Sequence, residues 1–505
     1  MQSHTFRVLL AFVALVAASC FVACQTSEDT AESSPAVSPT AAPHTRPNII
    51  VVVVDDLRWD ELGVTGHPYI ETPNIDRLAY EGAMLTSAFH AVPLCSPNRA
   101  SILTGQYPSR HGIIDNVARN RMSHRLQTYP QALQQAGYET GFLGKWHMGN
   151  DPTPRPGFDY WVAIPGQGNS ENPELYEDGR LHTVDGYLTD ILTDRAVDFI
   201  ERDREQPFCL YIGHKAMHPD IPQRDDGSAD LAASLGYVPA PRHRRRYEQA
   251  VFPRRPNVAD GLAGLADRPA VQRAVEARHS PEIQEMFKGV PAYEVTEEAI
   301  RGRAEMLLAV DDGIGRIMDA LDQAGISDDT AILFTSDNGF WYGEHGLTIE
   351  RRLPYEEGIR MPLLIRYPGL AQAESEIDEL VVSVDIAPTV LDLAQVPIGD
   401  HIQGRSFVPL LTGSTRDWRD SFLIEFYTYE QPVPWLVDMD YRAVRTERYK
   451  YIHWMQHPEE NELYDLAEDP YEKKNLIREE NMADVVANMQ QRLRDLALQA
   501  TGLAQ

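Results

Sequence analysis

Cysteine is scarce in this chain: its 505 residues include four, and two of these, Cys20 and Cys24, lie in an apolar N-terminal stretch. The other two, Cys95 and Cys209, cannot build a disulfide framework, so the fold must depend on a hydrophobic core. Hydrophobic residues make up 43% of the chain, which is ordinary for a globular protein. Because Cys209 lies inside the apolar run 208–212, we interpret it as a core residue of a buried strand.

Basic residues are also in deficit. The chain has 46 Lys and Arg against 75 Asp and Glu, which gives a formal net charge of -29. This balance excludes nucleic acid as a partner, because a phosphate backbone requires a net basic face. If the substrate is an anion, local positive charge at the site must outweigh the acidic surface.

One long apolar run occurs, and it lies at the N-terminus. It extends from Val8 to Ala23 after Arg7, and a segment rich in Ser, Thr, Ala and Pro follows it. This pattern predicts a secretory signal peptide at residues 1–24 and a flexible linker at residues 25–45, not a membrane-spanning helix of the mature protein.

Two cysteines near the end of this run resemble the lipid-attachment cysteine of bacterial lipoproteins. Small or apolar residues precede both Cys20 and Cys24. Signal cleavage without lipid attachment is the alternative. We therefore expect the mature protein in the periplasm or cell envelope of a bacterium, attached to a membrane by an N-terminal lipid, or otherwise secreted.

The stretch 95–105 is the chemical centre of the sequence. Ser96 is suited to cap a helix, Pro97 fits a first helical turn, and Gly105 fits the position just beyond a helix end. This pattern predicts that Cys95 lies at a helix N-terminus. The positive end of the helix dipole there favours an anionic substrate.

The spacing Cys-Ser-Pro-x-Arg from Cys95 to Arg99, followed by Leu-Thr-Gly, resembles the signature of the type I sulfatases. In that family a maturation enzyme oxidises the cysteine to formylglycine. Asn98 departs from the Ser or Ala that is usual there, although the three key residues remain. The alternative for Cys95 is a buried structural cysteine.

Two apolar runs, 48–54 and 330–335, each predict a buried strand that ends in acidic residues. Strands of an open α/β sheet place ligands at their carboxyl ends, and oxygen ligands suit calcium or magnesium better than zinc. A solvated turn is the alternative for the first acidic pair. With the formylglycine that the resemblance implies, the predicted cation ligands are Asp55, Asp56, Cys95, Asp337 and Asn338.

Two further elements resemble sulfatase motifs. The run 144–149 matches Gly-Lys-Trp-His-x-Gly, which assigns Lys145 to the sulfuryl oxygens and His147 to a hydroxyl of the hydrated formylglycine. A Lys-Ala-x-His element ends at His218, which the resemblance assigns to the leaving alcohol. His214, just before it, is interpreted as a packing residue.

The predicted anion contacts continue further along the chain. Residues 343–346, which include His345, and residues 355–362 resemble sulfatase blocks. Many family members have a lysine that touches the sulfate between these blocks, whereas this chain has Arg351 and Arg352. An arginine binds sulfate in a bidentate manner, so we assign substrate binding to these two arginines and His345.

The resemblance implies an alkaline-phosphatase-like α/β fold, in which helices sandwich a mixed sheet. We expect a catalytic domain at residues 46–412 and a C-terminal subdomain at 413–505, with a small antiparallel sheet and a final helix. Helices are predicted at 72–81, 129–136, 187–204, 297–324 and 482–500, and strands at 84–89, 140–143, 208–212, 422–427 and 441–452. Residues 220–294 lack periodicity and are expected to form a pocket rim. Within them, the basic run 242–246 is either part of the site or a solvated loop.

The implied activity is hydrolysis of a sulfate ester, with a sulfated carbohydrate favoured as substrate. By the resemblance, the formylglycine diol attacks sulfur while Asp337 or a neighbouring base helps remove its proton. Arg99, Lys145 and one further arginine neutralise the sulfuryl oxygens, His218 protonates the alcohol, and His147 assists expulsion of sulfate. The alternatives are a phosphomonoester or phosphonate hydrolase of the same fold, or a glycan-binding lipoprotein without catalysis.

Overall fold

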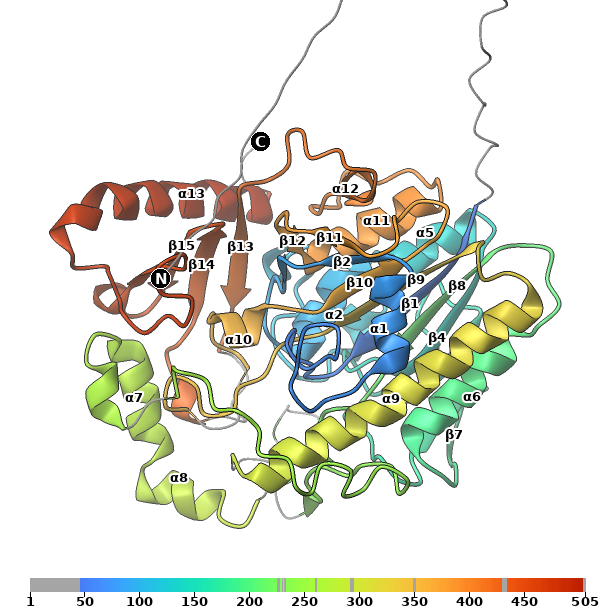
Figure 1. Ribbon diagram of the computed structural model, residues 1–505, viewed down its shortest axis with the longest axis horizontal. Coiled ribbons are helices and arrows are strands. Elements are labelled where there is room, and N and C mark those ends of the chain that lie inside the picture. Colours follow the sequence, from blue (N-terminus) through green and yellow to red (C-terminus); the bar gives the residue numbers. More distant parts are fainter. Residues whose placement is uncertain are drawn as a thin grey trace, which may run out of the picture. The chain divides into compact units, whose positions relative to one another are not determined.

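A ten-stranded mixed sheet forms the centre of the computed structural model (Figure 1). The structure describes residues 46–224, 228, 230, 233–258, 261–290, 295–347, 351–428 and 434–502. β1 (Asn48–Val54) lies between β8 (Phe208–Gly213) and β9 (Thr330–Ser336) and is parallel to both. Because neighbours cover both faces and both edges of β1, its β-branched side chains are buried as predicted.

The sheet follows the order β11-β2-β10-β9-β1-β8-β4-β5-β6-β7. The five strands from β9 to β5 are parallel, β10 is antiparallel to β9, and β6 and β7 form an antiparallel hairpin. The remaining strands of this sheet are β2 (Ala83–Leu85), β4 (Glu139–Lys145), β5 (Tyr160–Ile164), β6 (Glu174–Glu177), β7 (Arg180–Thr183), β10 (Leu363–Arg366) and β11 (Ser375–Ile377). Separately, β3 (Ala88–Phe89) pairs with β12 (Val381–Val382).

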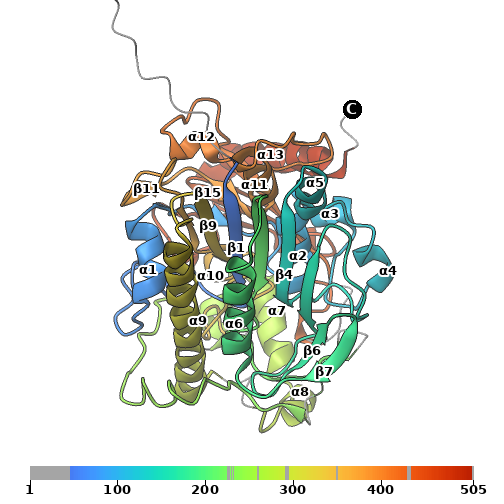
Figure 2. The same cartoon turned by 90° about the vertical axis from the view of Figure 1, so that its right-hand side faces the viewer.

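Helices cover both faces of the sheet, as the resemblance implied. Ile50, Val52 and Val54 of β1 pack in one core cluster with α6 (Leu188–Ile200) and α9 (Glu297–Ala324), which lie side by side (Figure 2). The alternate side chains of β1 pack on the opposite face. The helices of these two layers, with their short neighbours, are α1 (Pro73–Tyr80), α2 (Cys95–Thr104), α3 (Pro108–His111), α4 (Asn120–Ser123), α5 (Tyr129–Gln135), α10 (Glu356–Ile359), α11 (Ile386–Leu393) and α12 (Val408–Leu411).

A second sheet of four antiparallel strands follows in the C-terminal part, together with the final helix α13 (Ala483–Thr501). The single strand predicted at 441–452 is wrong, because Glu447 and Arg448 form a turn between two strands. Thr446 Oγ1 accepts the Tyr449 amide at 2.8 Å and stabilises this turn. The strands are β13 (Ser421–Phe426), β14 (Tyr441–Thr446), β15 (Tyr449–Trp454) and β16 (Glu462–Asp465).

Two other predicted segments differ in the structure. The strand predicted at 84–89 is divided between β2 and β3, which pair with different partners. Residues 220–294 also contain two helices, α7 (Pro269–Arg278) and α8 (Pro281–Met286). Each begins at a proline, which is favourable in a first helical turn although it resembles a break in the sequence.

None of the described helices is long and apolar enough to cross a membrane. Cys20 and Cys24 lie outside the described residues.

Candidate active site

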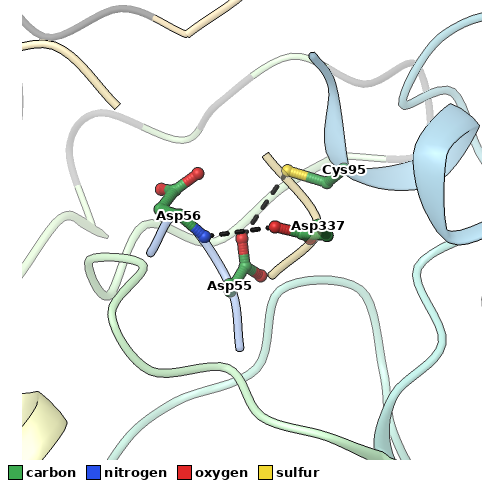
Figure 3. A group of neighbouring side chains, drawn as sticks. All are labelled: Asp55, Asp56, Cys95 and Asp337. Atoms are coloured by element: carbon green, nitrogen blue, oxygen red, sulfur yellow. Dashed lines mark hydrogen bonds between the residues drawn. The ribbon is translucent and has the colours of Figure 1, made fainter. Parts of the chain in front are cut away.

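The acidic ends of β1 and β9 meet at one edge of the sheet. The parallel register pairs Val54 with Ser336, so the residues that follow each strand are neighbours. The Asp56 amide donates a hydrogen bond to Asp337 Oδ1 at 3.1 Å (Figure 3). Asp56 has a φ of 59°, a left-handed turn that ends β1 abruptly at this point.

Cys95 is the first residue of α2 and faces this acidic group. Its Sγ lies 3.7 Å from Asp55 Oδ1 (Figure 3). The predicted cap by Ser96 is wrong: Leu94 occupies the cap position, and Ser96 Oγ donates to the His147 carbonyl oxygen at 2.7 Å. Gly105 ends the helix with a φ of 66°, as its position predicted.

The group formed by Asp55, Asp56, Cys95 and Asp337 is suited to a cation. All four side chains are buried, and each offers one ligand atom within 4.8 Å of the others. Burial and the nearby charge of Asp337 raise the pKa of Asp55. Asn338 adds a carbonyl oxygen, Oδ1, that is buried and accepts no hydrogen bond from the described residues. An oxygen-rich, negatively charged set of this kind fits a hard divalent cation.

Three basic side chains surround the carboxylates. Arg99 Nε donates to Asp337 Oδ2 at 2.8 Å, and its NH2 lies 3.4 Å from Asp55 Oδ2. Lys145 Nζ forms a buried ion pair with Asp55. Arg351 Nε lies 3.3 Å from Asp56 Oδ1, so the arginine between the two sequence blocks reaches this group. This local positive charge resolves the apparent conflict between an acidic chain and an anionic substrate.

The two predicted acid–base histidines are both buried. Burial, and next to it the charge of Lys145, hold the pKa of His147 and of His218 well below the ordinary value. His218 Nδ1 donates to the Pro219 carbonyl oxygen at 2.8 Å, and His147 Nε2 lies 2.6 Å from Gln223 Oε1. Both rings are therefore neutral in the free protein at neutral pH.

Comparison with known proteins identifies the family. Residues 47–396 match the family model described as Sulfatase, and residues 343–499 match the one described as N-sulphoglucosamine sulphohydrolase, C-terminal. The N-acetylglucosamine-6-O-sulfatase of Bacteroides thetaiotaomicron is 33% identical over 94% of this chain and 88% of its own length. This chain belongs to the sulfatase family. It is a sulfuric ester hydrolase.

Solved structures show the same fold. One, determined in complex with its substrate D-glucosamine-2-N,6-O-disulfate, has a TM-score of 0.75 and 32% identity over 91% of this chain and 99% of that chain. The phosphonate monoester hydrolase of Agrobacterium radiobacter has a TM-score of 0.70 and 23% identity over 90% and 96% of the two chains. At that identity the likeness shows the fold alone. Human N-acetylglucosamine-6-sulfatase is 29% identical over 75% of this chain and 67% of its own length.

The other predicted anion contacts of this sulfatase lie in different surroundings. Arg352 is buried next to Arg351, and its carbonyl oxygen accepts from Tyr441 at 2.8 Å. His345 lies in a second buried cluster, where its Nδ1 is 2.9 Å from Arg268 NH1 and its ring stacks on Tyr355 at 4.0 Å. Among the described residues, the hydrogen-bond partners of His345 are not members of the Cys95 group.

Sequence reasoning missed several residues that hold the sulfatase site in place. Asn98, noted only as a departure from the family, donates to the Asp337 carbonyl oxygen at 2.7 Å. Arg303, in the second turn of α9, donates to the Asp56 carbonyl oxygen at 2.6 Å. Gln223 contacts His147 as described above. The partners in these contacts are far apart in the sequence, so the spacing of residues in a motif could not reveal them. For Arg303 the one available signal was that an arginine occupies a buried position in the apolar pattern of α9.

Proposed function

We propose that this sulfatase removes a 6-O-sulfate group from glucosamine or N-acetylglucosamine units of a sulfated glycan. The names of the Bacteroides and human relatives both specify a sulfate at position 6 of N-acetylglucosamine. The structural neighbour that was solved with its substrate bound a glucosamine that carries a 6-O-sulfate. The observation that carries the catalytic part of the proposal is the buried group of Asp55, Asp56, Cys95 and Asp337.

The proposal includes formylglycine at position 95 and a divalent cation, calcium or magnesium. Asp55, Asp56, Asp337 and Asn338 would hold the cation, which supplies positive charge to the sulfuryl oxygens. Formylglycine, when hydrated, supplies the hydroxyl that attacks sulfur. The unsatisfied Asn338 Oδ1 supports the fit, since a buried oxygen without a donor is costly unless a ligand uses it.

The side chains around this group would divide the remaining work. Arg99, Lys145 and Arg351, all three buried, orient the sulfate and neutralise its charge. The negative charge of the bound ester favours protonation of His218, which then donates its proton to the leaving alcohol. His147 takes up a proton from the hydroxyl at position 95 in the second half of the reaction.

Turnover of matched esters tests the proposed function. N-acetylglucosamine-6-sulfate and N-acetylglucosamine-6-phosphate share a leaving alcohol, so their kcat/KM values compare the two oxyanions directly. We expect faster hydrolysis of the sulfate, and faster hydrolysis of 6-O-sulfate than of a 3-O-sulfate on the same sugar. Faster phosphate hydrolysis would instead favour the phosphomonoester hydrolase, and binding without any turnover would favour the glycan-binding protein.

We also propose that the protein is exported and attached to the bacterial cell envelope through a lipid on Cys20 or Cys24. The apolar N-terminal run and its two cysteines support this localisation. Membrane fractionation of Cys20→Ala and Cys24→Ala variants tests it. The variant that lacks the lipidated cysteine should move to the soluble fraction, whereas an unchanged distribution in both would contradict lipid attachment.

A further inference from the structure

Hydrogen bonds connect four residues in a closed ring beside the nucleophile position. Ser96 Oγ donates to the His147 carbonyl oxygen at 2.7 Å, and the Ser96 amide donates to Asn116 Oδ1 at 3.1 Å. Gln223 closes the ring: its Nε2 donates to the Asn116 carbonyl oxygen at 3.4 Å, and its Oε1 lies 2.6 Å from His147 Nε2. The ring therefore ties the residue next to Cys95 to the imidazole of His147.

This ring selects one tautomer of His147. The Gln223 amide nitrogen is directed at the Asn116 carbonyl oxygen, so the Gln223 carbonyl oxygen faces the imidazole. Because a carbonyl oxygen can only accept, His147 Nε2 must carry the proton, and Nδ1 keeps its lone pair. Nδ1 is buried and has no hydrogen-bond partner among the described residues. A buried acceptor of this kind requires a functional explanation.

A hydrogen bond ties the backbone of His147 to Ser96, the residue that follows Cys95. Burial raises the pKa of Cys95, as does Asp55, while the charges of Arg351 and Lys145 oppose this shift. Burial lowers the pKa of His147, and the same two basic side chains lower it further. The charges of Lys145 and Arg351 therefore act on both residues. His147 also has a φ of 66°, a left-handed conformation that surrounding contacts must hold.

We propose that Gln223 is a positioning residue, which fixes the Nε2–H tautomer of His147 so that Nδ1 can accept a proton from the hydroxyl at position 95. The inference rests on the proposed function. As the C–O bond to sulfate breaks, the hydroxyl proton moves to Nδ1 and the O–H electron pair becomes the second bond of the restored aldehyde. Sulfate leaves with the electron pair of the broken bond, so no further reactant is needed.

Two substitutions at Gln223 separate orientation from packing. Gln223→Met keeps the size of the side chain but removes the accepting oxygen, whereas Gln223→Glu keeps the oxygen. We expect Gln223→Met to lower kcat about 10- to 100-fold with KM nearly unchanged, because His147 loses the partner that fixes its tautomer and its action as a general base, worth about 100-fold or more, is weakened. Gln223→Glu should keep kcat within about fivefold of the wild type, since its carboxylate still accepts from Nε2–H.

The opposite pattern overturns the inference: Gln223→Met with wild-type kcat and Gln223→Glu impaired would show a packing role. Gln131→Met is the matched control: Gln131 lies on α5 and its Nε2 donates to the Leu126 carbonyl oxygen at 2.9 Å, and no hydrogen bond joins it to His147 among the described residues. The control should keep wild-type kcat, and all variants should keep the wild-type Tm. If the wild type hydrolyses the 6-sulfate ester while Gln223→Met does so equally well, the proposed function stands and the role of Gln223 falls.

Discussion

At the scale of single residues, Asn98 departs from the family pattern and makes several buried hydrogen bonds. Its amide nitrogen donates to the Asp337 carbonyl oxygen and lies 2.9 Å from His90 Nδ1, and its oxygen accepts from Ser383 at 2.5 Å. All of these groups are buried. Asn98 thus joins α2 to the loop that carries the second acidic strand end.

We predict that Asn98→Ala destabilises the protein although Ala is common at this position of the family. The substitution leaves the buried polar groups of Asp337 and Ser383 without their partner, which costs roughly 1–3 kcal/mol. Urea denaturation measures the loss in the free energy of unfolding. A loss below about 0.5 kcal/mol would contradict the structural role, and Asn488→Ala, on the exposed surface of α13, serves as the neutral control.

His111 of α3 gives a prediction for the dependence of stability on pH. Burial lowers the pKa of His111 to about 3, while the unfolded value is near 6.5. The unfolded state therefore binds one more proton between these values, so this contribution to stability is complete above pH 6.5 and falls as the pH falls toward 3. The slope is about 1.4 kcal/mol per pH unit.

Denaturation of the wild type and of His111→Asn at pH 7 and pH 5 tests this effect. The variant is expected to be less stable at pH 7, because Ser101 Oγ, 3.1 Å from His111 Nε2, loses its partner. It should also lose less stability between the two pH values. Equal losses in the two proteins would show that His111 does not titrate on unfolding.

At the scale of elements, the C-terminal sheet supports the segment that carries Arg351 and Arg352. Tyr441 donates to the Arg352 carbonyl oxygen at 2.8 Å, and Lys450 Nζ donates to the Pro354 carbonyl oxygen at 2.9 Å. Lys450 Nζ also lies 2.9 Å from Glu356 Oε1 and 2.6 Å from Glu472 Oε1. The position of Arg351 beside the carboxylates therefore depends on a sheet far along the chain.

We predict that Lys450→Met destabilises the protein by about 3–5 kcal/mol, because buried Glu472 loses its ion-pair partner and buried Glu356 keeps only Arg445 among the described residues. Lys474→Met is the matched control, since Lys474 pairs with Glu479 at 2.9 Å on the exposed surface. It should change the free energy of unfolding by less than about 0.5 kcal/mol. Similar losses in the two variants would argue against a supporting role for the buried network.

The elements whose signals are local could be predicted from the sequence. The bounds of α9 were predicted as 297–324 because its apolar period is regular and Gly325 follows it. β1 and β9 were clear from their apolar runs. The cap assigned to Ser96 failed because its hydroxyl bonds to His147, which follows a different strand. The prediction of one strand at 441–452 failed because two short strands and the polar turn between them resemble one long strand in the sequence.

At the scale of the whole molecule, a chain with net charge -29 places three basic side chains, Arg99, Lys145 and Arg351, around a few buried carboxylates. Four carboxylate and thiol groups from three distant segments meet within 4.8 Å. The sequence predicted that the acidic residues after β1 and β9 lie together, because parallel strands bring their carboxyl ends to one edge of the sheet. The contacts of Gln223 and Arg303 could not be predicted, since they depend on how the loops and α9 pack.

Removal of the cation should lower the stability of the whole molecule. We predict that calcium at about 100 times its Kd stabilises the protein by roughly 2.7 kcal/mol, and thus raises Tm by several degrees over a chelator-treated sample. Asp56→Asn should reduce this shift, because it removes one ligand charge. Asp312→Asn, at an exposed ion pair with Arg242, should keep it. If calcium raised the Tm of both variants by the same amount, the cation would bind at a site that does not include Asp56.

The central claim is that Cys95 becomes the formylglycine nucleophile of a sulfatase that acts on a sulfated glycan. Mass spectrometry of the peptide that contains Cys95, taken from native protein that hydrolyses N-acetylglucosamine-6-sulfate, tests it most directly. We predict that the peptide carries the aldehyde, and that Cys95→Ala abolishes turnover. An intact thiol in every molecule of an active preparation would contradict the account.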